Sequence, residues 1–105
     1  MLTLAIDTAT KVCSVALCRD GEITAEYNIN MGMTHSEGLL PQLEQLLKRT
    51  NTKKQDIDLI AVSMGPGSFT GLRIGLATAE AMVYSWRCLL HGVDTLKALA
   101  YNIPL

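Results

Sequence analysis

A glycine-rich stretch between two apolar segments constrains this chain most strongly. Residues 64–75 read MGPGSFTGLRIG; they follow the apolar run Leu59–Ser63 and precede an alanine-rich segment that ends near Trp86. This order is typical of a buried strand, a tight turn and a helix. Gly65 and Gly67 take positive φ without steric cost. The stretch therefore predicts a strand-to-helix turn within an α/β unit.

The end of this turn is a candidate anion site. Ser68 or Thr70 is predicted to cap the following helix through its side-chain oxygen, and unpaired backbone N–H groups gather at such a terminus. The spacing matches neither established phosphate pattern, because no lysine stands in the motif as a P-loop requires. Its glycines are spaced G-x-G-x-x-x-G, whereas a dinucleotide site needs G-x-G-x-x-G. The residues alone favour a structural turn over a phosphate site.

The exact string GPGSFTGLRIG is more specific than a glycine-rich strand-to-helix turn in general. Shorter pieces accompany it, namely IDTAT at residues 6–10, HSE at 35–37 and GV at 92–93. Together they resemble the bacterial TsaB (YeaZ) family of tRNA threonylcarbamoyladenosine biosynthesis proteins, in the TsaD or glycoprotease-like superfamily. The resemblance covers essentially the whole chain. It implies an actin-like fold and a protein that pairs with the catalytic paralogue TsaD and the ATPase TsaE to place threonylcarbamoyl on adenosine-37 of transfer RNA.

The apolar periodicity predicts an α/β fold. Strands are expected at residues 2–7, 12–18, 23–29, 59–63 and 88–93, and helices near 39–47, 72–86 and 96–102. Asp20-Gly21 predicts a tight hairpin, and Pro41 predicts that the first helix starts late. The order β-β-β-α-β-α-β-α with a mixed sheet is that of an actin-like, ribonuclease-H-like half domain. Residues 1–105 are expected to form this single N-terminal domain, with the second half of the family fold absent.

Asp7 is a candidate ligand for magnesium at the end of the first strand. In actin-like ATPases an aspartate at this place helps to position magnesium near phosphate, but glycine usually follows it, whereas Ala9 stands here. Alternatively, Asp7 accepts hydrogen bonds from N–H groups of its own turn. This second interpretation is favoured because no second magnesium carboxylate is identifiable. The candidate phosphate or structural turn comprises Asp7, Gly65, Gly67, Ser68, Thr70, Gly71 and Arg73.

Charge and hydropathy exclude several classes of protein. The formal net charge of -1 gives no global attraction to nucleic acid or to an anionic membrane. The basic pairs Lys48-Arg49 and Lys53-Lys54 are assigned to a helix end and a solvated surface, so transfer RNA is expected to be contacted only indirectly. No apolar run approaches the ~20 residues of a membrane span, and no signal peptide is apparent. A cytoplasmic protein is expected.

Metal and disulfide chemistry are not indicated. Cys13, Cys18 and Cys88 show no C-x-x-C spacing and fit reduced thiols. The catalytic paralogue holds its metal with an H-x-x-x-H pair, whereas His35 and His91 are far apart in the sequence. No metal, cofactor or catalytic residue is therefore expected, and the peptidase label of the wider family is disfavoured.

The two long helices predict an interface. The helix near 72–86 is apolar almost all round, which indicates burial on two sides. One side can cover the sheet and the other requires a second apolar surface, from a copy of this chain or from TsaD. The interface is expected to comprise Leu39, Leu43, Leu47, Ile74, Gly75, Thr78, Ala81 and Tyr84.

Two functions of different classes remain open at this point. The first is a noncatalytic partner that binds TsaD in threonylcarbamoyl transfer and forms a homodimer through the two helices. The second is an actin-like phosphoryl-transfer enzyme that binds ATP at Asp7 and the turn from Gly65 to Gly71. Nucleotide titration and a mixing experiment with a TsaD-like protein distinguish them.

Overall fold

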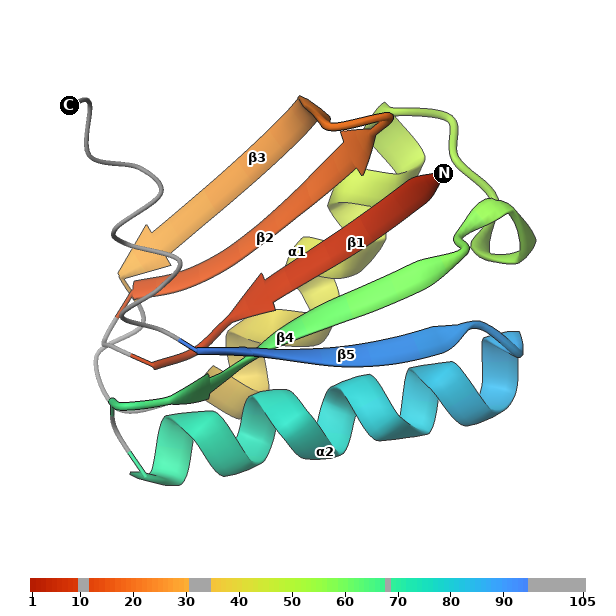
Figure 1. Ribbon diagram of the computed structural model, residues 1–105. Helices are drawn as coiled ribbons and strands as arrows, with labels where there is room; N and C mark the ends of the chain where they lie inside the picture. Colours follow the sequence, from red (N-terminus) through yellow and green to blue (C-terminus); the bar gives the residue numbers. More distant parts are fainter. Residues whose placement is uncertain (10–11, 31–34, 68, 95–105) are drawn as a thin grey trace, which may run out of the picture.

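The first thirty residues form an antiparallel meander. A computed structural model describes residues 1–9, 12–30, 35–67 and 69–94 (Figure 1). Strands β1 (Leu2–Asp7), β2 (Val12–Arg19) and β3 (Glu22–Asn30) pair in succession. Asp20 and Gly21 join β2 to β3 with φ of 51° and 87°. Two positive φ angles are the geometry of a primed hairpin turn, as the Asp-Gly sequence predicts.

The rest of the chain adds two parallel strands to the meander. Helix α1 (His35–Arg49) and a 3-10 turn η1 (Lys54–Asp56) lead to β4 (Leu59–Gly65). Helix α2 (Phe69–Trp86) then leads to β5 (Leu89–Asp94). The sheet order is β3-β2-β1-β4-β5, with β4 parallel to both β1 and β5. The predicted mixed sheet and element order are confirmed as far as β5; the predicted helix at 96–102 lies outside the described residues.

One core lies between the sheet and the two helices. Alternate residues of the central strands are buried, among them Leu4, Val15 and Ile60, each less than 1% exposed. They pack in one cluster with leucines of α1 and with Ala79 and Met82 of α2. Helix α1 lies over β2 and β3, and α2 lies over β4 and its neighbours. Both helices therefore share a face of the sheet.

Helix α1 begins earlier than predicted. Pro41 favours a late start because an interior proline removes a backbone hydrogen bond, yet the helix runs from His35 and contains Pro41. The leucine stripe explains this outcome, because Leu39, Leu43 and Leu46 are each at most 2% exposed against the sheet. Burial of these side chains outweighs the local cost of the proline.

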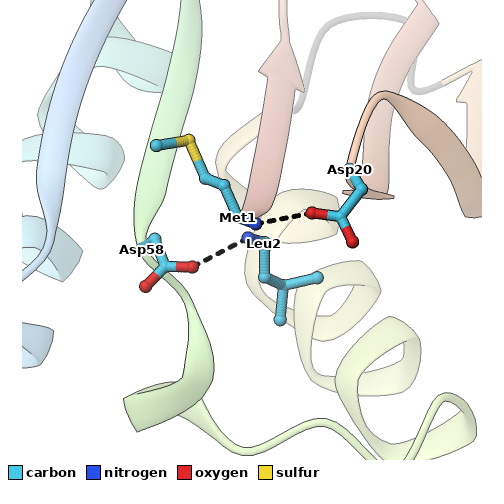
Figure 2. Close-up of polar contacts among 4 residues, drawn as sticks. All are labelled: Met1, Leu2, Asp20 and Asp58. Atoms are coloured by element: carbon cyan, nitrogen blue, oxygen red, sulfur yellow. Dashed lines mark hydrogen bonds and ion pairs between the residues drawn. The ribbon is translucent and has the colours of Figure 1, made fainter.

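Two aspartates bind the start of β1 through hydrogen bonds and an ion pair (Figure 2). The Met1 ammonium forms an ion pair with Asp20, with 2.7 Å between the nitrogen and Oδ1. The backbone N–H of Leu2 donates to Asp58 Oδ2 at 2.8 Å. Asp58 also donates its N–H to the Leu2 carbonyl and accepts from the N–H of Leu89. Asp58 thus links the starts of β1, β4 and β5.

Candidate functional site at the Asp7 and Gly65 turns

The two candidate turns lie side by side because they follow neighbouring parallel strands. Residues 3–6 of β1 are in register with residues 59–62 of β4, so both turns leave the same edge of the sheet (Figure 1). Thr8 is 0% exposed, and its hydroxyl donates to the Gly71 carbonyl oxygen at 2.5 Å. The turn after β1 is therefore fastened to the first turn of α2.

The glycines of the motif have different structural roles. Gly65 has a φ of +116°, which favours glycine. Gly67 and Gly75 are required by close approach: a Cβ at position 67 would lie 2.6 Å from the Ala9 carbonyl oxygen, and one at position 75 would clash with the Thr8 hydroxyl. The motif therefore serves to pack one turn against the other.

Asp7 takes part in the same packing. Its Oδ1 accepts a hydrogen bond from the N–H of Ala9 at 2.9 Å, which is the arrangement that the turn interpretation predicts. Asp7 also borders a hollow of about 350 Å³ with Ser14, Glu26 and Ser63. This hollow lies on the sheet face opposite the helices, over a row of alanines in register on three strands: Ala16, Ala5 and Ala61.

Magnesium and a nucleotide phosphate, which an actin-like fold implies, do not fit these turns. A phosphate cradle needs open backbone N–H groups beside its glycines. Here the Ala9 carbonyl oxygen lies against Gly67, and an acceptor at this place repels an anion. The Asp7 carboxylate is already bonded to its own turn. Within the described residues, no three His, Cys, Asp or Glu side chains group as metal ligands.

The remaining predicted turn residues divide as follows. Ser68 lies outside the described residues. Thr70 lies in the first turn of α2, which begins at Phe69, so of the two predicted caps only Ser68 precedes the helix. Arg73 is exposed and borders a hollow of about 370 Å³ with Thr70, Ile74 and Ala77. Gly71 is buried and accepts the hydrogen bond from Thr8.

Four of the predicted interface residues are buried within the chain, which corrects the prediction. Leu39, Leu43 and Leu47 are 1%, 2% and 6% exposed because the leucine stripe of α1 faces the sheet. Gly75 is buried against Thr8. A partner cannot reach these side chains without unfolding the core.

The other predicted interface residues do reach the surface of α2. Ala81 is exposed, Tyr84 is 89% exposed, and Ile74 and Thr78 are half-buried. Leu40 and Ala77, which the prediction did not include, also reach this surface. Leu40 is 52% exposed and borders, with Ala77, Thr78 and Ala81, a groove of about 380 Å³ between the helices. Leu40 lies off the buried leucine stripe of α1, and this position in the sequence pattern already indicates that its side chain is exposed.

Among the residues that the structure describes, histidine and cysteine add no chemistry to these turns. His91 is exposed on β5, while the side chain of His35 lies outside the described residues. Burial raises the pKa of the Cys13 thiol, and also those of Cys18 and Cys88. A raised thiol pKa lowers the thiolate fraction at neutral pH and with it the nucleophilicity. Within the described residues, no helix is both long and apolar enough to cross a membrane.

Comparisons with known proteins identify the family. The profile of the family described as TsaD, tRNA N6-adenosine threonylcarbamoyltransferase, matches residues 29–105. The tRNA threonylcarbamoyladenosine biosynthesis protein TsaB of Escherichia coli is 40% identical to this chain over 95% of the chain's length. The TsaB protein of Bacillus subtilis is 36% identical to it over 97% of the chain's length. The aligned part is 43% and 44% of those relatives, so the chain spans less than half their length.

A solved structure shows the same fold. YeaZ from Pseudomonas aeruginosa superposes with a TM-score of 0.90 at 32% identity, over 96% of this chain and 47% of that protein. The superposition includes the mixed sheet and the helices described above. The chain therefore belongs to the TsaD (tRNA N6-adenosine threonylcarbamoyltransferase) family, and within it resembles the TsaB (YeaZ) proteins.

Proposed function

We propose that this chain acts in tRNA threonylcarbamoyladenosine biosynthesis in the cytoplasm, as a noncatalytic partner of a TsaD-like paralogue and a TsaE-like ATPase. The relatives named TsaB support the pathway. The observation that carries the partner role is the apolar outer side of α2, where Tyr84 is 89% exposed and Ala77 and Ala81 face solvent. Soluble proteins that expose a contiguous apolar patch commonly use it for binding.

The proposed contact surface is the α2 strip, defined as Ala77, Thr78, Ala81 and Tyr84 together with Leu40 of α1. Small side chains at positions 77, 78 and 81 allow a partner helix to come close, since the distance between packed helices follows the size of the residues at the contact. Tyr84 and Leu40 would supply most of the buried apolar area. The groove between the helices gives the partner a concave seat.

The same strip fits a second copy of this chain. Two-fold symmetry is the commonest symmetry of homodimers, and a two-fold axis would place the strip of one copy against the same strip of the other. The two helices of each copy would then form a four-helix contact. A TsaD-like paralogue with a similar pair of helices would compete for the strip, so the homodimer and the heterodimer are expected to exclude each other.

Replacement of Ala81 with glutamate tests this function. An unpaired carboxylate in a desolvated contact is strongly unfavourable, so Ala81→Glu should weaken binding to a TsaD-like paralogue by at least tenfold, roughly 1.4 kcal/mol. Thr24→Glu adds the same charge at an exposed position of β3 and is the matched control. Complex mass by light scattering and circular dichroism of each variant give the result.

The corresponding change at Leu43 is unsuitable. Leu43 is 2% exposed, so a glutamate there would unfold the core rather than report on a partner. The proposal is wrong if the parent chain stays monomeric at high concentration and never joins a TsaD-like protein. It is also wrong if Ala81→Glu and Thr24→Glu bind the paralogue with equal affinity. The phosphoryl-transfer alternative gains no support, because the Ala9 carbonyl lies against the glycine turn.

A further inference from the structure

Basic side chains gather at the end of the sheet where β1, β4 and β5 begin. Lys48 stands in the last turn of α1, Lys53 and Lys54 flank the start of η1, and Arg87 follows the end of α2. These elements meet at the same end of the sheet (Figure 1). Each of the four side chains is exposed. They are called the basic rim below.

The end of α1 does not need these charges as caps. Thr50 Oγ1 donates to the Leu46 carbonyl at 2.7 Å, and the N–H of Thr52 donates to the Leu47 carbonyl at 2.9 Å. The N–H of Asn51 donates to the Lys48 carbonyl. Backbone and threonine groups thus satisfy the carbonyls of Leu46, Leu47 and Lys48 near the end of the helix. The lysine ammonium groups reach the solvent, which agrees with the helix end and solvated surface expected from the sequence.

Acidic neighbours compensate the basic rim only in part. The carboxylate of Asp20 is neutralised by the Met1 ammonium, whereas that of Asp58 accepts only from the neutral N–H of Leu2 and keeps its negative charge. Asp56 in η1 and Glu44, which borders the same hollow as Lys54, remain. Within the described part of the chain the rim side chains form no ion pair. The four cations of the rim thus stand against three charged carboxylates, those of Glu44, Asp56 and Asp58, which leaves a small positive excess on a chain of net charge -1.

One contact joins the η1 part of the rim to the end of α2. The Lys54 ammonium lies over the Trp86 ring, 5.8 Å from its centroid. This cation–π contact brings Lys54 beside the end of α2, where Arg87 follows. Two segments distant in the sequence thus present their charges together. The rim begins beyond the last turn of α2, whereas the α2 strip runs along the helix before it.

We propose that the basic rim binds the phosphate backbone of RNA, and specifically that of the transfer RNA substrate; this inference rests on the proposed function. Exposed ammonium and guanidinium groups that form no ion pair within the described residues suit a polyanion with repeated phosphates, and each contact releases a counterion. Contacts of this kind position the nucleic acid without reading its sequence. The rim therefore orients transfer RNA while the base chemistry takes place on the partner.

The test compares Lys53→Gln/Lys54→Gln with the charge-preserving Lys53→Arg/Lys54→Arg. Fluorescence anisotropy with an unmodified tRNA transcript is measured over a series of salt concentrations, for the chain alone and for its complex with a TsaD-like protein. The glutamine pair should weaken binding roughly tenfold at low salt. It should also lower the slope of log affinity against log salt by about 2, one for each lost phosphate contact. The arginine pair should retain both values.

Unchanged affinity and slope in the glutamine pair would overturn the inference. Binding of the parent chain to phosphatidylserine vesicles, with none to tRNA, would assign the rim to a membrane surface and would equally overturn it. If the rim changes weaken RNA binding by the chain alone but no complex forms with a TsaD-like protein, the proposed function fails while the RNA-binding rim stands. Circular dichroism confirms that each variant is folded.

Discussion

At the residue scale, the contact between Thr8 and Gly75 determines how the two turns pack. A Cβ at position 75 would clash with the Thr8 hydroxyl, so Gly75→Ala should lower the free energy of unfolding by about 1–3 kcal/mol, as overpacking does. The better helix propensity of alanine, worth about 1 kcal/mol, offsets only part of this. Urea denaturation measures the change.

The Thr8→Ala background provides the control for this prediction. That variant loses the hydrogen bond to Gly71 but removes the hydroxyl that the new Cβ would strike. Gly75→Ala should therefore lower the free energy of unfolding less in the Thr8→Ala background than in the parent. A double-mutant cycle detects this coupling. A stabilising effect of Gly75→Ala in the parent would contradict the packing role.

Gln42 carries a second residue-scale prediction. Its side chain is 3% exposed, and among the described residues neither its amide nitrogen nor its amide oxygen has a hydrogen-bond partner. A buried polar group without a partner costs about 1–3 kcal/mol. Gln42→Met keeps the shape without the amide and should raise the free energy of unfolding by about 1 kcal/mol. Gln45→Met, at an exposed position of the same helix, should change it little; equal effects would refute the argument.

The pair between Met1 and Asp20 predicts a pH dependence of stability. Hydrogen bonding to Asp20 raises the ammonium pKa above its ordinary 8.0, and the same bond lowers the Asp20 pKa below 3.8. The ammonium contribution is present at lower pH and is lost as pH rises through its raised pKa. The carboxylate contribution is present above pH 3.8 and is lost as pH falls through its lowered pKa.

The loss of stability caused by Asp20→Asn should therefore become smaller at both pH extremes, where the parent chain also lacks the ion pair. The difference should be largest between about pH 4 and pH 8, the window set by the two unfolded pKa values. Thermal melts across this range measure it. Glu22→Gln, in the same hairpin, removes one charge without touching Met1 and should show no such window. A pH-independent effect of Asp20→Asn would contradict the ion pair.

At the element scale, Pro41 shows what the sequence predicts and what it does not. The strands follow from apolar alternation, and the Asp20-Gly21 hairpin follows from turn chemistry. The start of α1 does not, because the local cost of Pro41 is outweighed by burial of Leu39 and Leu43 on a sheet built elsewhere in the chain. Local propensity is thus a weak guide where tertiary contacts act on the same residues.

Pro41→Ala should stabilise the fold. The exposed proline lacks the N–H that would continue the hydrogen bonds of α1, and an interior proline costs up to about 3 kcal/mol relative to alanine. The gain is smaller because alanine leaves the unfolded chain freer, so a rise of about 1–2 kcal/mol in the free energy of unfolding is expected. Denaturant titration checks it, with Glu44→Ala as a neutral exposed control.

Helix α2 shows why the candidate interface was only partly predictable. A helix that is apolar all round does not reveal which side faces its own sheet. The small residues Gly75 and Ala79 are buried within the chain, whereas Ala77 and Ala81 are exposed to solvent. What decides between them is the contact with Thr8, which is far away in the sequence. Such a contact follows from the sheet register, not from periodicity along the helix.

At the scale of the whole molecule, the chain spans less than half the length of its TsaB relatives. Actin-like folds, which the family resemblance implies, close a nucleotide cleft between two halves. The edge that would face such a cleft carries the turns after β1 and β4, and these turns are packed against each other. This packing places the Ala9 carbonyl oxygen against Gly67, where it would repel a phosphate.

The last prediction follows from that packing: this chain should bind ATP weakly or not at all. The Ala9 carbonyl lies against Gly67, where an acceptor repels a phosphate, and Asp7 Oδ1 already accepts the N–H of its own turn, so both features disfavour a magnesium–phosphate group. Calorimetry with ATP and magnesium measures this. Ala9→Gly removes the side chain against Gly67 but keeps the carbonyl that repels an anion, so it should not restore binding. Tight magnesium-dependent binding by the parent chain, abolished by Asp7→Asn, would reverse the conclusion and favour a phosphoryl-transfer role.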